Sequence, residues 1–150
     1  EFGDIYAYEV DGYGQYNLMD DANVPSLLSM GYLGYEGSRP EVEENTRRFL
    51  LSDANPYYFK GKVAAGIGSP HTPSGYIWHI AMAIQGLTSA SKEEKREVLE
   101  NMAETTGGKG VMHEGFCCED DSKFTRAWFS WANAMYSELF LDYMGYQLEK

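Results

Sequence analysis

The sequence predicts an all-α fold in which pairs of antiparallel helices are separated by long loops. Three observations lead to this prediction: apolar side chains recur at helical spacing, helix-starting and helix-ending residues flank these segments, and glycine-rich stretches lie between them. Long helices in antiparallel pairs, separated by loops rich in residues of functional type, indicate an α/α arrangement. No Ser/Gly-rich linker interrupts residues 1–150, and we expect them to form one structural unit.

The N-terminal part of the chain is predicted to contain little helix. Residues 5–14 alternate between apolar and polar side chains like a strand, and Asp11 followed by glycine is typical of a turn. Asn23 caps helices well, and Pro25 fits a first helical turn. A short helix over residues 26–30 is therefore expected.

Four longer helices follow from periodicity and capping signals. Capping-box spacing precedes the first helix at Ser38 and Glu41, and Ser91 begins the third helix in the same way. Ser122 is the expected N-cap of the last helix. Residues 57–74 lack helical periodicity and hold several Gly and Pro residues, which is typical of a functional or mobile loop. The predicted helices cover residues 40–54, 76–87, 92–105 and 123–143.

The charge balance argues against two kinds of partner. The chain carries 23 acidic and 12 basic side chains, a formal net charge of −11. Nucleic acid and anionic membrane surfaces would be repelled, and no Lys/Arg stripe offsets the negative charge. No apolar run approaches the roughly 20 residues of a membrane span, and no signal peptide is expected at the start of the sequence.

The two cysteines, Cys117 and Cys118, are adjacent in the sequence. Neighbouring cysteines rarely reach relaxed disulfide geometry, so two partly buried thiols are expected, with a redox or metal-binding role as the alternative. Free thiols favour the cytoplasm over a secreted location.

The segment 110–116 holds the strongest candidate for a catalytic group. It places Glu114 beside His113, between two glycines, in a loop expected to join two helices. Catalytic groups often lie on loops held by a rigid scaffold, although a solvated loop acid is the simpler interpretation of Glu114 alone. An aromatic content of 15%, with Trp128 and Trp131 nearby in sequence, indicates an aromatic-lined cleft suited to stacking on a sugar ring.

Two adjacent acids, Asp20 and Asp21, precede the helix expected after Asn23. Acids near a helix N-terminus interact favourably with its dipole, which explains one acid better than two in an apolar stretch. The pair could bind hydroxyl groups, have shifted pKa values or bind Ca²⁺, although the spacing matches no EF-hand loop. Asp11 is a further candidate carboxylate.

The histidines are His71, His79 and His113. His71 lies in a loop rich in glycine and proline, where it could organise the loop or contact a ligand. The spacing of the three matches no zinc motif, so we expect neither a catalytic metal nor a bound cofactor. The sequence contains no phosphate-binding loop, no dinucleotide fingerprint and no Gly-x-Ser-x-Gly motif.

This inventory of side chains fits glycoside hydrolysis. The reaction needs two carboxyl groups, polar groups that hold hydroxyls, and flat aromatic surfaces. In the inverting form one carboxyl protonates the leaving oxygen and the other activates a water, with the two roughly 6.5–9.5 Å apart. Glu114 is a candidate for the base, while Asp20, Asp21 and Asn23 could hold sugar hydroxyls.

Several sequence blocks follow one another from near the start of the chain to near its end. They are Asp11–Gly14, Met19–Leu28, Thr46–Phe49, Asn55–Phe59, Gly66–Pro73, Met112–Glu114, Phe124–Arg126, Trp128–Phe129 and Trp131–Asn133. Together these blocks resemble glycoside hydrolase family 125. So many blocks in one order are far more specific than any one of them alone.

The resemblance implies an exo-acting α-1,6-mannosidase that works by inversion, without a metal, on an (α/α)6 barrel. Family members are much longer than this chain, so residues 1–150 would form the C-terminal part of the barrel domain, a partial α/α toroid. Glu114 would be the general base, and the acid, an Asp, would lie upstream of Glu1. Asp11, Asp20 and Asp21 would then line the terminal-mannose subsite, unless one of them is the acid.

The resemblance also implies a ligand and further site residues. The expected substrate is a mannose-containing oligosaccharide or N-glycan fragment. The side chains expected to bind it, besides the three acids, are Asn23, His71, His113, Trp128 and Trp131. The sequence departs from the family pattern at positions that bear on fine specificity rather than on chemistry, namely His79, Gly115 and Ala127.

Two alternatives to a complete mannosidase stay open. The chain alone could be an inactive fragment that lacks the general acid and self-associates through the barrel surface it leaves exposed. It could also be a mannose-binding or scaffold module in which Glu114 only binds hydroxyls. Mannose release by the chain alone would speak against the first alternative, and binding without hydrolysis by the complete protein would support the second.

Overall fold

The computed structural model describes residues 1–37 and 39–146. Four helices and seven short strands lie in this part of the chain, and the expected cap Ser38 lies outside it. No helix in the described part is long and apolar enough to cross a membrane. In chain order the elements are β1 (Glu9–Val10), β2 (Tyr16–Asn17), α1 (Pro40–Leu50), β3 (Tyr58–Lys60), β4 (Ala65–Ile67), β5 (Tyr76–Trp78), α2 (His79–Leu87), α3 (Lys92–Glu104), β6 (Gly115–Cys117), β7 (Asp120–Thr125) and α4 (Ser130–Tyr143).

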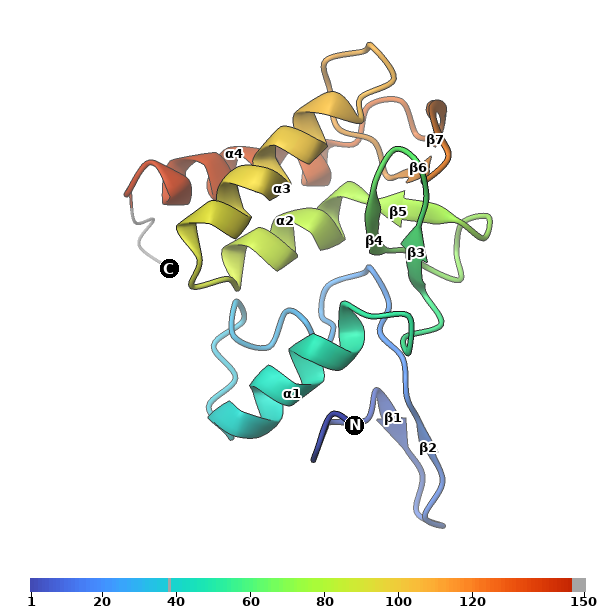
Figure 1. Ribbon diagram of the computed structural model, residues 1–150, viewed down its shortest axis with the longest axis vertical. Helices are drawn as coiled ribbons and strands as arrows, with labels where there is room; N and C mark the ends of the chain where they lie inside the picture. Colours follow the sequence, from blue (N-terminus) through green and yellow to red (C-terminus); the bar gives the residue numbers. More distant parts are fainter. Residues whose placement is uncertain (38, 147–150) are drawn as a thin grey trace.

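The prediction of an all-α fold, and of a partial (α/α)6 barrel, is wrong for these residues. The strands form three antiparallel sheets, β1–β2, β3–β4 and β5–β6–β7, so the fold is mixed α/β. Figure 1 shows α2, α3 and α4 side by side, with the three-stranded sheet at one end of them. Most of these strands are only two or three residues long, which is too short for the alternation that identifies a strand in sequence.

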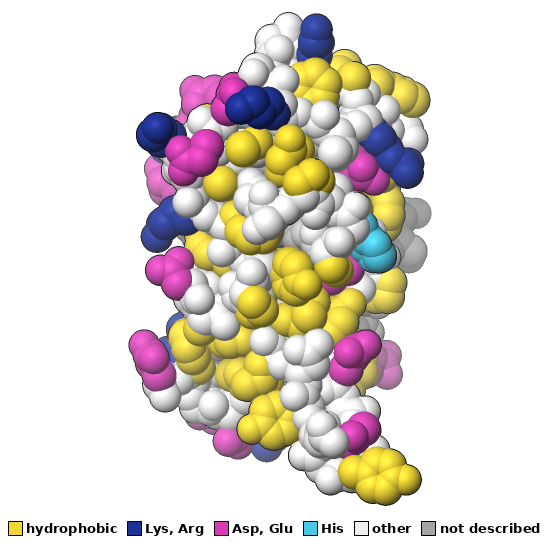
Figure 2. Space-filling view, turned by 90° about the vertical axis from the view of Figure 1, so that its right-hand side faces the viewer, with side chains coloured by type: hydrophobic (Ala, Val, Ile, Leu, Met, Phe, Trp, Pro, Cys, Tyr) yellow, Lys and Arg dark blue, Asp and Glu magenta, His cyan; other side chains and the backbone are white. Residues whose placement is uncertain are grey.

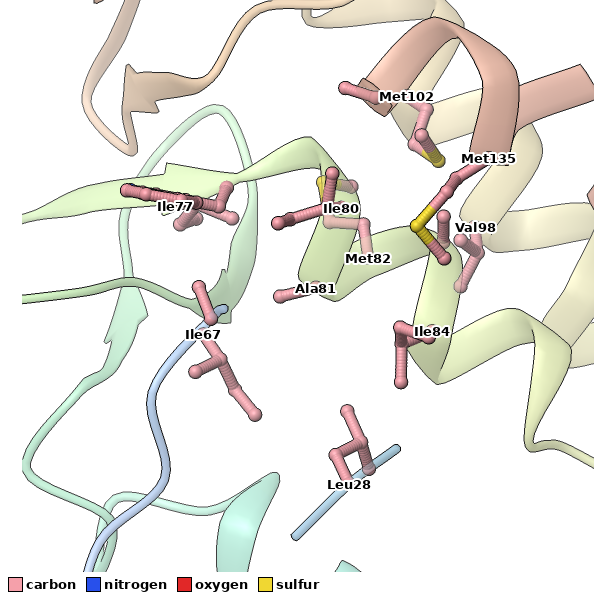
Figure 3. Packing of buried hydrophobic residues seen from close by; sticks show 14 of the residues in the cluster. Leu28, Ile67, Ile77, Ile80, Ala81, Met82, Ile84, Val98, Met102 and Met135 are labelled. Carbon is pink, nitrogen blue, oxygen red and sulfur yellow. The ribbon is translucent and has the colours of Figure 1, made fainter. Parts of the chain in front are cut away.

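Helix α2 forms the centre of the hydrophobic core. It packs against both α3 and α4, and a helix covered on most sides is apolar nearly all round. Gly86 lets α4 approach closely, because a Cβ at this position would lie 2.7 Å from Leu139 Cδ2. Figure 3 shows side chains of the three helices converging on this core, joined by Leu28 and by Ile67 of β4.

Helix α1 buries the face that its sequence predicts. Pro40 occupies the first turn, and the helix ends at Leu50, a few residues earlier than predicted. The hydroxyl of Thr46 accepts the backbone N–H of Tyr6 at 2.9 Å and so ties the N-terminal segment to the helix. The buried residues of α1 are Val42, Thr46, Phe49 and Leu50.

Helix α3 begins with the cap that the sequence predicts. The Ser91 hydroxyl oxygen accepts the backbone N–H of Glu94 at 3.2 Å. The Glu94 carboxylate is used elsewhere, since Arg47 Nη2 lies 2.8 Å from its Oε1. This ion pair joins α1 to α3.

The short helix expected over residues 26–30 is wrong. These residues form a bend and turns, in which Asp20 accepts the N–H groups of Leu27 and Leu28. The Ser26 N–H, which an Asn23 cap would have satisfied, donates to the hydroxyl oxygen of Ser29 instead. The accepting carboxylate therefore lies further back in the chain than an N-cap residue would.

Two other predicted helices begin too early. Tyr76–Trp78 form β5, and the helix starts only at His79, because the first three residues pair with β6. Ser122 lies within β7 instead of capping a helix, and the last helix starts at Ser130. In both cases strand formation overrides the local helical pattern, through pairing of β5 with the distant β6 and of β7 with its hairpin neighbour β6.

Candidate active site

Glu114 lies directly before β6, at the open end of the hairpin that β6 forms with β7. Gly115 pairs with Thr125 in this hairpin, so the antiparallel register places Glu114 opposite Arg126. Arg126 Nε lies 3.1 Å from Glu114 Oε1. Only 15% of the Glu114 side chain is exposed, so this is a largely buried carboxylate paired with a cation.

Arg126 is the member of the site that sequence reasoning missed. Its φ is +44°, a left-handed conformation that residues with a side chain rarely adopt. Its guanidinium lies over the ring of Phe129, 5.6 Å from the ring centre. The bounds of the two strands alone would not have identified Arg126, because regular pairing continued from Cys117 and Asp120 would place residue 123 opposite Glu114. The register shift between Phe116 and Cys117 brings Arg126 to that position instead.

The backbone before Glu114 is held by side chains from two helices. The amide of Asn133, in α4, accepts the N–H of Met112 at 3.1 Å and donates to its carbonyl oxygen at 3.2 Å. The N–H of His113 donates to Nδ1 of His79, the first residue of α2, at 2.9 Å. These contacts make the Glu114 loop a rigid platform.

His113 is fully buried and fastens the same loop through its ring. One ring nitrogen lies 2.7 Å from the carbonyl oxygen of Ala127, and the other lies 2.9 Å from that of Thr106. The ring also stacks on Phe124, with centroids 3.9 Å apart. These surroundings favour a structural role for His113 over the predicted contact with substrate.

His79 is a second buried histidine beside the loop. Since its Nδ1 accepts the N–H of His113, the neutral ring carries its proton on Nε2, which lies 3.0 Å from the hydroxyl oxygen of Thr105. Burial lowers the pKa of His79 to about 4, so the ring is neutral at neutral pH. His79 thus links the start of α2 to the end of α3 and to the loop.

Trp78 connects the Glu114 hairpin to the loop that contains His71. Trp78 pairs with Gly115 between β5 and β6, and a Cβ at Gly115 would lie 3.0 Å from the indole Cδ1. The indole N–H donates to the hydroxyl oxygen of Thr72 at 2.9 Å. The two loops therefore lie against one side chain, and glycine at position 115 makes this approach possible.

Asp20 is fully buried, and both of its oxygens are engaged. Oδ1 accepts the N–H of Leu27 at 2.9 Å, and Oδ2 accepts the N–H of Leu28 at 3.0 Å. Desolvation raises the pKa of Asp20 to about 6, against the opposing effect of these hydrogen bonds. The geometry favours a side chain that organises its own segment over one that binds sugar hydroxyls.

Asp21, Asn23 and His71, three of the predicted site residues, lie together. Asp21 Oδ1 accepts the N–H of Asn23 at 3.2 Å, and Asp21 Oδ2 lies 3.9 Å from His71 Nε2. Asp21 is buried, whereas His71 is largely exposed. The N–H of Ala22 donates to the carbonyl oxygen of Gly68 at 3.0 Å and holds the two segments together. We call Asp21, Asn23 and His71 the polar cluster.

A pocket of about 580 Å³ lies beside the His71 loop. The rings of Tyr57 and Phe59 meet edge to face on its wall, with centroids 6.5 Å apart. Aromatic rings combined with hydroxyl groups suit the mixed polar and apolar faces of a sugar. The lining residues are Asn17, Met19, Pro56, Tyr57, Phe59, Ser69, Pro70, Thr72 and Ser74.

The other predicted site residues are not in the polar cluster. Asp11 lies in the β1–β2 hairpin, which projects from the body of the molecule (Figures 1 and 2), and its Oδ1 accepts the N–H groups of Tyr13 and Gln15 at 2.8 Å. Its carboxylate is therefore used in its own turn. Trp128 and Trp131 border the start of α4, with 66% and 39% of their surface exposed.

Metal-ligating side chains are not clustered in the described part of the chain. No group of three or more His, Cys, Asp and Glu residues there is arranged to hold a metal ion. Cys117 and Cys118 are free thiols, the first half-buried and the second buried, and burial raises the pKa of the Cys118 thiol.

The site combines a carboxylate on a rigid loop with a polar cluster and a pocket of aromatic and hydroxyl groups. This arrangement is typical of carbohydrate-processing enzymes. Comparison with known families agrees. The family model of the metal-independent alpha-mannosidases (GH125) matches residues 1–141. The chain belongs to this family, as its sequence blocks predict.

Two relatives show how much of the family's length this chain spans. The meiotically up-regulated gene 157 protein of Schizosaccharomyces pombe is 49% identical over 143 residues, which are 95% of this chain and 28% of that protein. A metal-independent alpha mannosidase of Streptococcus pneumoniae, solved in a non-productive complex with alpha-1,6-mannobiose, is 52% identical with a TM-score of 0.92. That match covers 95% of this chain and 34% of the solved chain.

Proposed function

We propose that this chain carries the general base of an exo-acting α-1,6-mannosidase that works with inversion and without a metal. Family membership supports the hydrolysis of α-mannosides, and α-1,6-mannobiose is the ligand of the solved relative. Residues 1–150 would be one structural unit, the C-terminal part of the catalytic domain. The observation on which the proposal rests is the largely buried Glu114 carboxylate, held on a rigid loop and paired with Arg126 at 3.1 Å.

In the proposed reaction Glu114 takes a proton from a water while the water oxygen bonds to the anomeric carbon. The general acid protonates the glycosidic oxygen as its bond to the anomeric carbon breaks, and mannose is released with inverted configuration. Glu114 suits the role of base because Arg126 Nε lies 3.1 Å from its Oε1 and thereby orients the carboxylate.

The general acid is proposed to lie in the part of the relatives that this chain does not cover. Asp20 is a poor candidate because it is fully buried and both its oxygens accept backbone N–H groups. Asp11 is a poor candidate because its carboxylate closes its own turn. Asp21 is proposed to hold sugar hydroxyls instead.

The terminal mannose is proposed to bind at the polar cluster. Asp21 can accept hydrogen bonds from hydroxyls, and the exposed His71 and the amide of Asn23 add further partners. The exposed rings of Trp128 and Trp131 are proposed to shape the approach to the pocket.

The test is Glu114→Gln in a polypeptide of the relatives' full length that carries this chain. The substitution keeps the shape of the side chain but removes its basicity. We expect mannose release from α-1,6-mannobiose to fall by about 10²–10⁴-fold, with unchanged circular dichroism. The matched control is Glu119→Gln, an exposed acid of the same hairpin, which should keep the wild-type rate. Near-normal release by Glu114→Gln would contradict the proposal.

The chain by itself is proposed to be inactive, because it lacks the general acid. Incubating the 150-residue chain with α-1,6-mannobiose tests this point. Measurable mannose release would place the acid within residues 1–150 and contradict this assignment. Binding of mannose without hydrolysis by the full-length polypeptide would instead support a binding or scaffold role.

A further inference from the structure

We propose that Arg126 is a positioning residue for Glu114, holding the carboxylate through Oε1 in the direction from which it takes the proton of the attacking water. This inference rests on the proposed function, because it assigns a role relative to the general base. Arg126 Nε lies 3.1 Å from Glu114 Oε1, so Arg126 acts through the base.

Two contacts fix the segment that carries Arg126. On one side Thr125 pairs with Gly115 at the end of the hairpin. On the other side the carbonyl oxygen of Ala127 lies 2.7 Å from His113 Nδ1. The residues that flank the base are therefore tied to the residues that flank Arg126, and the two charged groups face each other with little freedom.

The backbone conformation of Arg126 also indicates a specific role. Its φ of +44° is the one positive value among the non-glycine residues of the described part. Strained backbone of this kind persists where the surroundings enforce it, and it is concentrated at functional sites. In this conformation the guanidinium lies over the Phe129 ring and reaches Glu114.

A purely structural role explains these features less well. The Arg126 side chain is 66% exposed, and ion pairs of exposed side chains contribute little to stability. The partner, by contrast, is the largely buried Glu114 on its rigid loop. The contact therefore determines the orientation of the carboxylate more than the stability of the fold.

The test uses a polypeptide of the relatives' full length that carries this chain, with α-1,6-mannobiose as substrate. Arg126→Gly removes the guanidinium and keeps the backbone, because glycine adopts positive φ without strain. We expect kcat to fall about 100-fold while KM changes less than about twofold and Tm stays equal or rises. Millimolar guanidinium should restore part of the kcat of this variant and leave the wild type unchanged.

Two further variants serve as controls. Arg126→Lys keeps the charge but not the planar fork, and we expect it to retain only part of the wild-type kcat. Lys123→Ala removes an exposed cation of the same hairpin and should match the wild type. The inference is overturned if Arg126→Gly has a normal kcat, if it only raises KM, or if guanidinium restores none of the lost activity.

Glu114→Gln separates a failure of this inference from a failure of the proposed function. An inactive Glu114→Gln together with a fully active Arg126→Gly removes only the positioning role. An active Glu114→Gln contradicts the assignment of the base, and the role of Arg126 with it.

Discussion

Asp20 and Glu114 are two carboxylates that are mostly shielded from solvent but have different kinds of hydrogen-bonding and ion-pair partners. Asp20 is fully buried, and its oxygens accept the N–H groups of Leu27 and Leu28. Glu114 retains some exposure, and one oxygen meets the solvent-exposed Arg126. The Asp20 carboxylate is occupied by hydrogen bonds within its own segment, whereas the Glu114 carboxylate lies on a rigid loop.

This difference indicates which property distinguishes a structural carboxylate from a candidate catalytic carboxylate. Both residues lie in sequence blocks of the same family, and both are poorly exposed, so neither feature separates them. Their partners do separate them, because backbone amides of a folded segment are permanent donors. A carboxylate that is bound on one side by a single side chain keeps lone pairs for a water or a substrate.

Asp20→Ala is expected to give the largest loss of stability. The buried N–H of Leu28 and the part-buried N–H of Leu27 lose their acceptor at a cost of about 1–3 kcal/mol each, so we expect the free energy of unfolding to fall by about 4 kcal/mol at pH 5. Glu114→Gln loses only an ion pair with an exposed arginine and should change the free energy of unfolding by less than about 1 kcal/mol. Urea unfolding followed by circular dichroism measures both values. A larger loss for Glu114→Gln than for Asp20→Ala would reverse the roles assigned to these residues.

The pH dependence of stability is expected to show the burial of Asp20. Burial raises its pKa from 3.8 to about 6, so the folded state keeps the proton over a range where the unfolded state has lost it. The contribution of this raised pKa to the free energy of unfolding is therefore complete below about pH 4. It is lost as the pH rises to about 6 and beyond, by about 3 kcal/mol in total.

The measurement compares urea unfolding of the wild type and Asp20→Asn between pH 4 and pH 7. Because Asn does not titrate, the stability of the wild type relative to this variant should decrease by that amount as the pH rises. A relative stability that is independent of pH would show that the Asp20 carboxyl has its ordinary pKa in the folded chain.

Asp11→Ala is expected to have the smallest effect. Its carboxylate accepts the N–H groups of Tyr13 and Gln15 in an exposed turn, where water can replace it. We therefore expect the free energy of unfolding to fall by less than about 1 kcal/mol. Mannose release by the full-length polypeptide should be unchanged, because the carboxylate is engaged within the hairpin. A strong rise in KM on α-1,6-mannobiose would instead assign Asp11 to substrate binding.

The helices were predictable where local signals act alone. The buried face of α1 and the Ser91 cap of α3 follow from apolar spacing and capping chemistry. The start of α2 was not predictable, because Ile77 and Ile80 continue one helical period across the junction between β5 and α2. Ser122 resembles a helix cap, yet it lies within β7, which pairs with β6 on either side of it. Such pairing depends on contacts that local periodicity does not encode.

The site was predictable in its chemistry but not in its geometry. The sequence indicates Glu114 and the polar cluster, because acids, amides and histidines in glycine-rich loops carry chemistry. It does not separate Asp20 from Asp21, since only the folded chain shows which carboxylate receives the N–H groups of Leu27 and Leu28. Arg126 depends on the hairpin register and could not be named without it.

The identity of the general base can be tested by azide rescue of Glu114→Ala in the full-length polypeptide. With α-mannosyl fluoride as substrate, fluoride leaves without a protonated leaving group, so turnover depends on the attacking nucleophile and its base. We predict that azide raises the turnover of Glu114→Ala and yields β-mannosyl azide, while the wild type and Glu119→Ala gain nothing. If azide leaves Glu114→Ala unchanged, or if this variant is nearly as active as the wild type without azide, Glu114 is not the base.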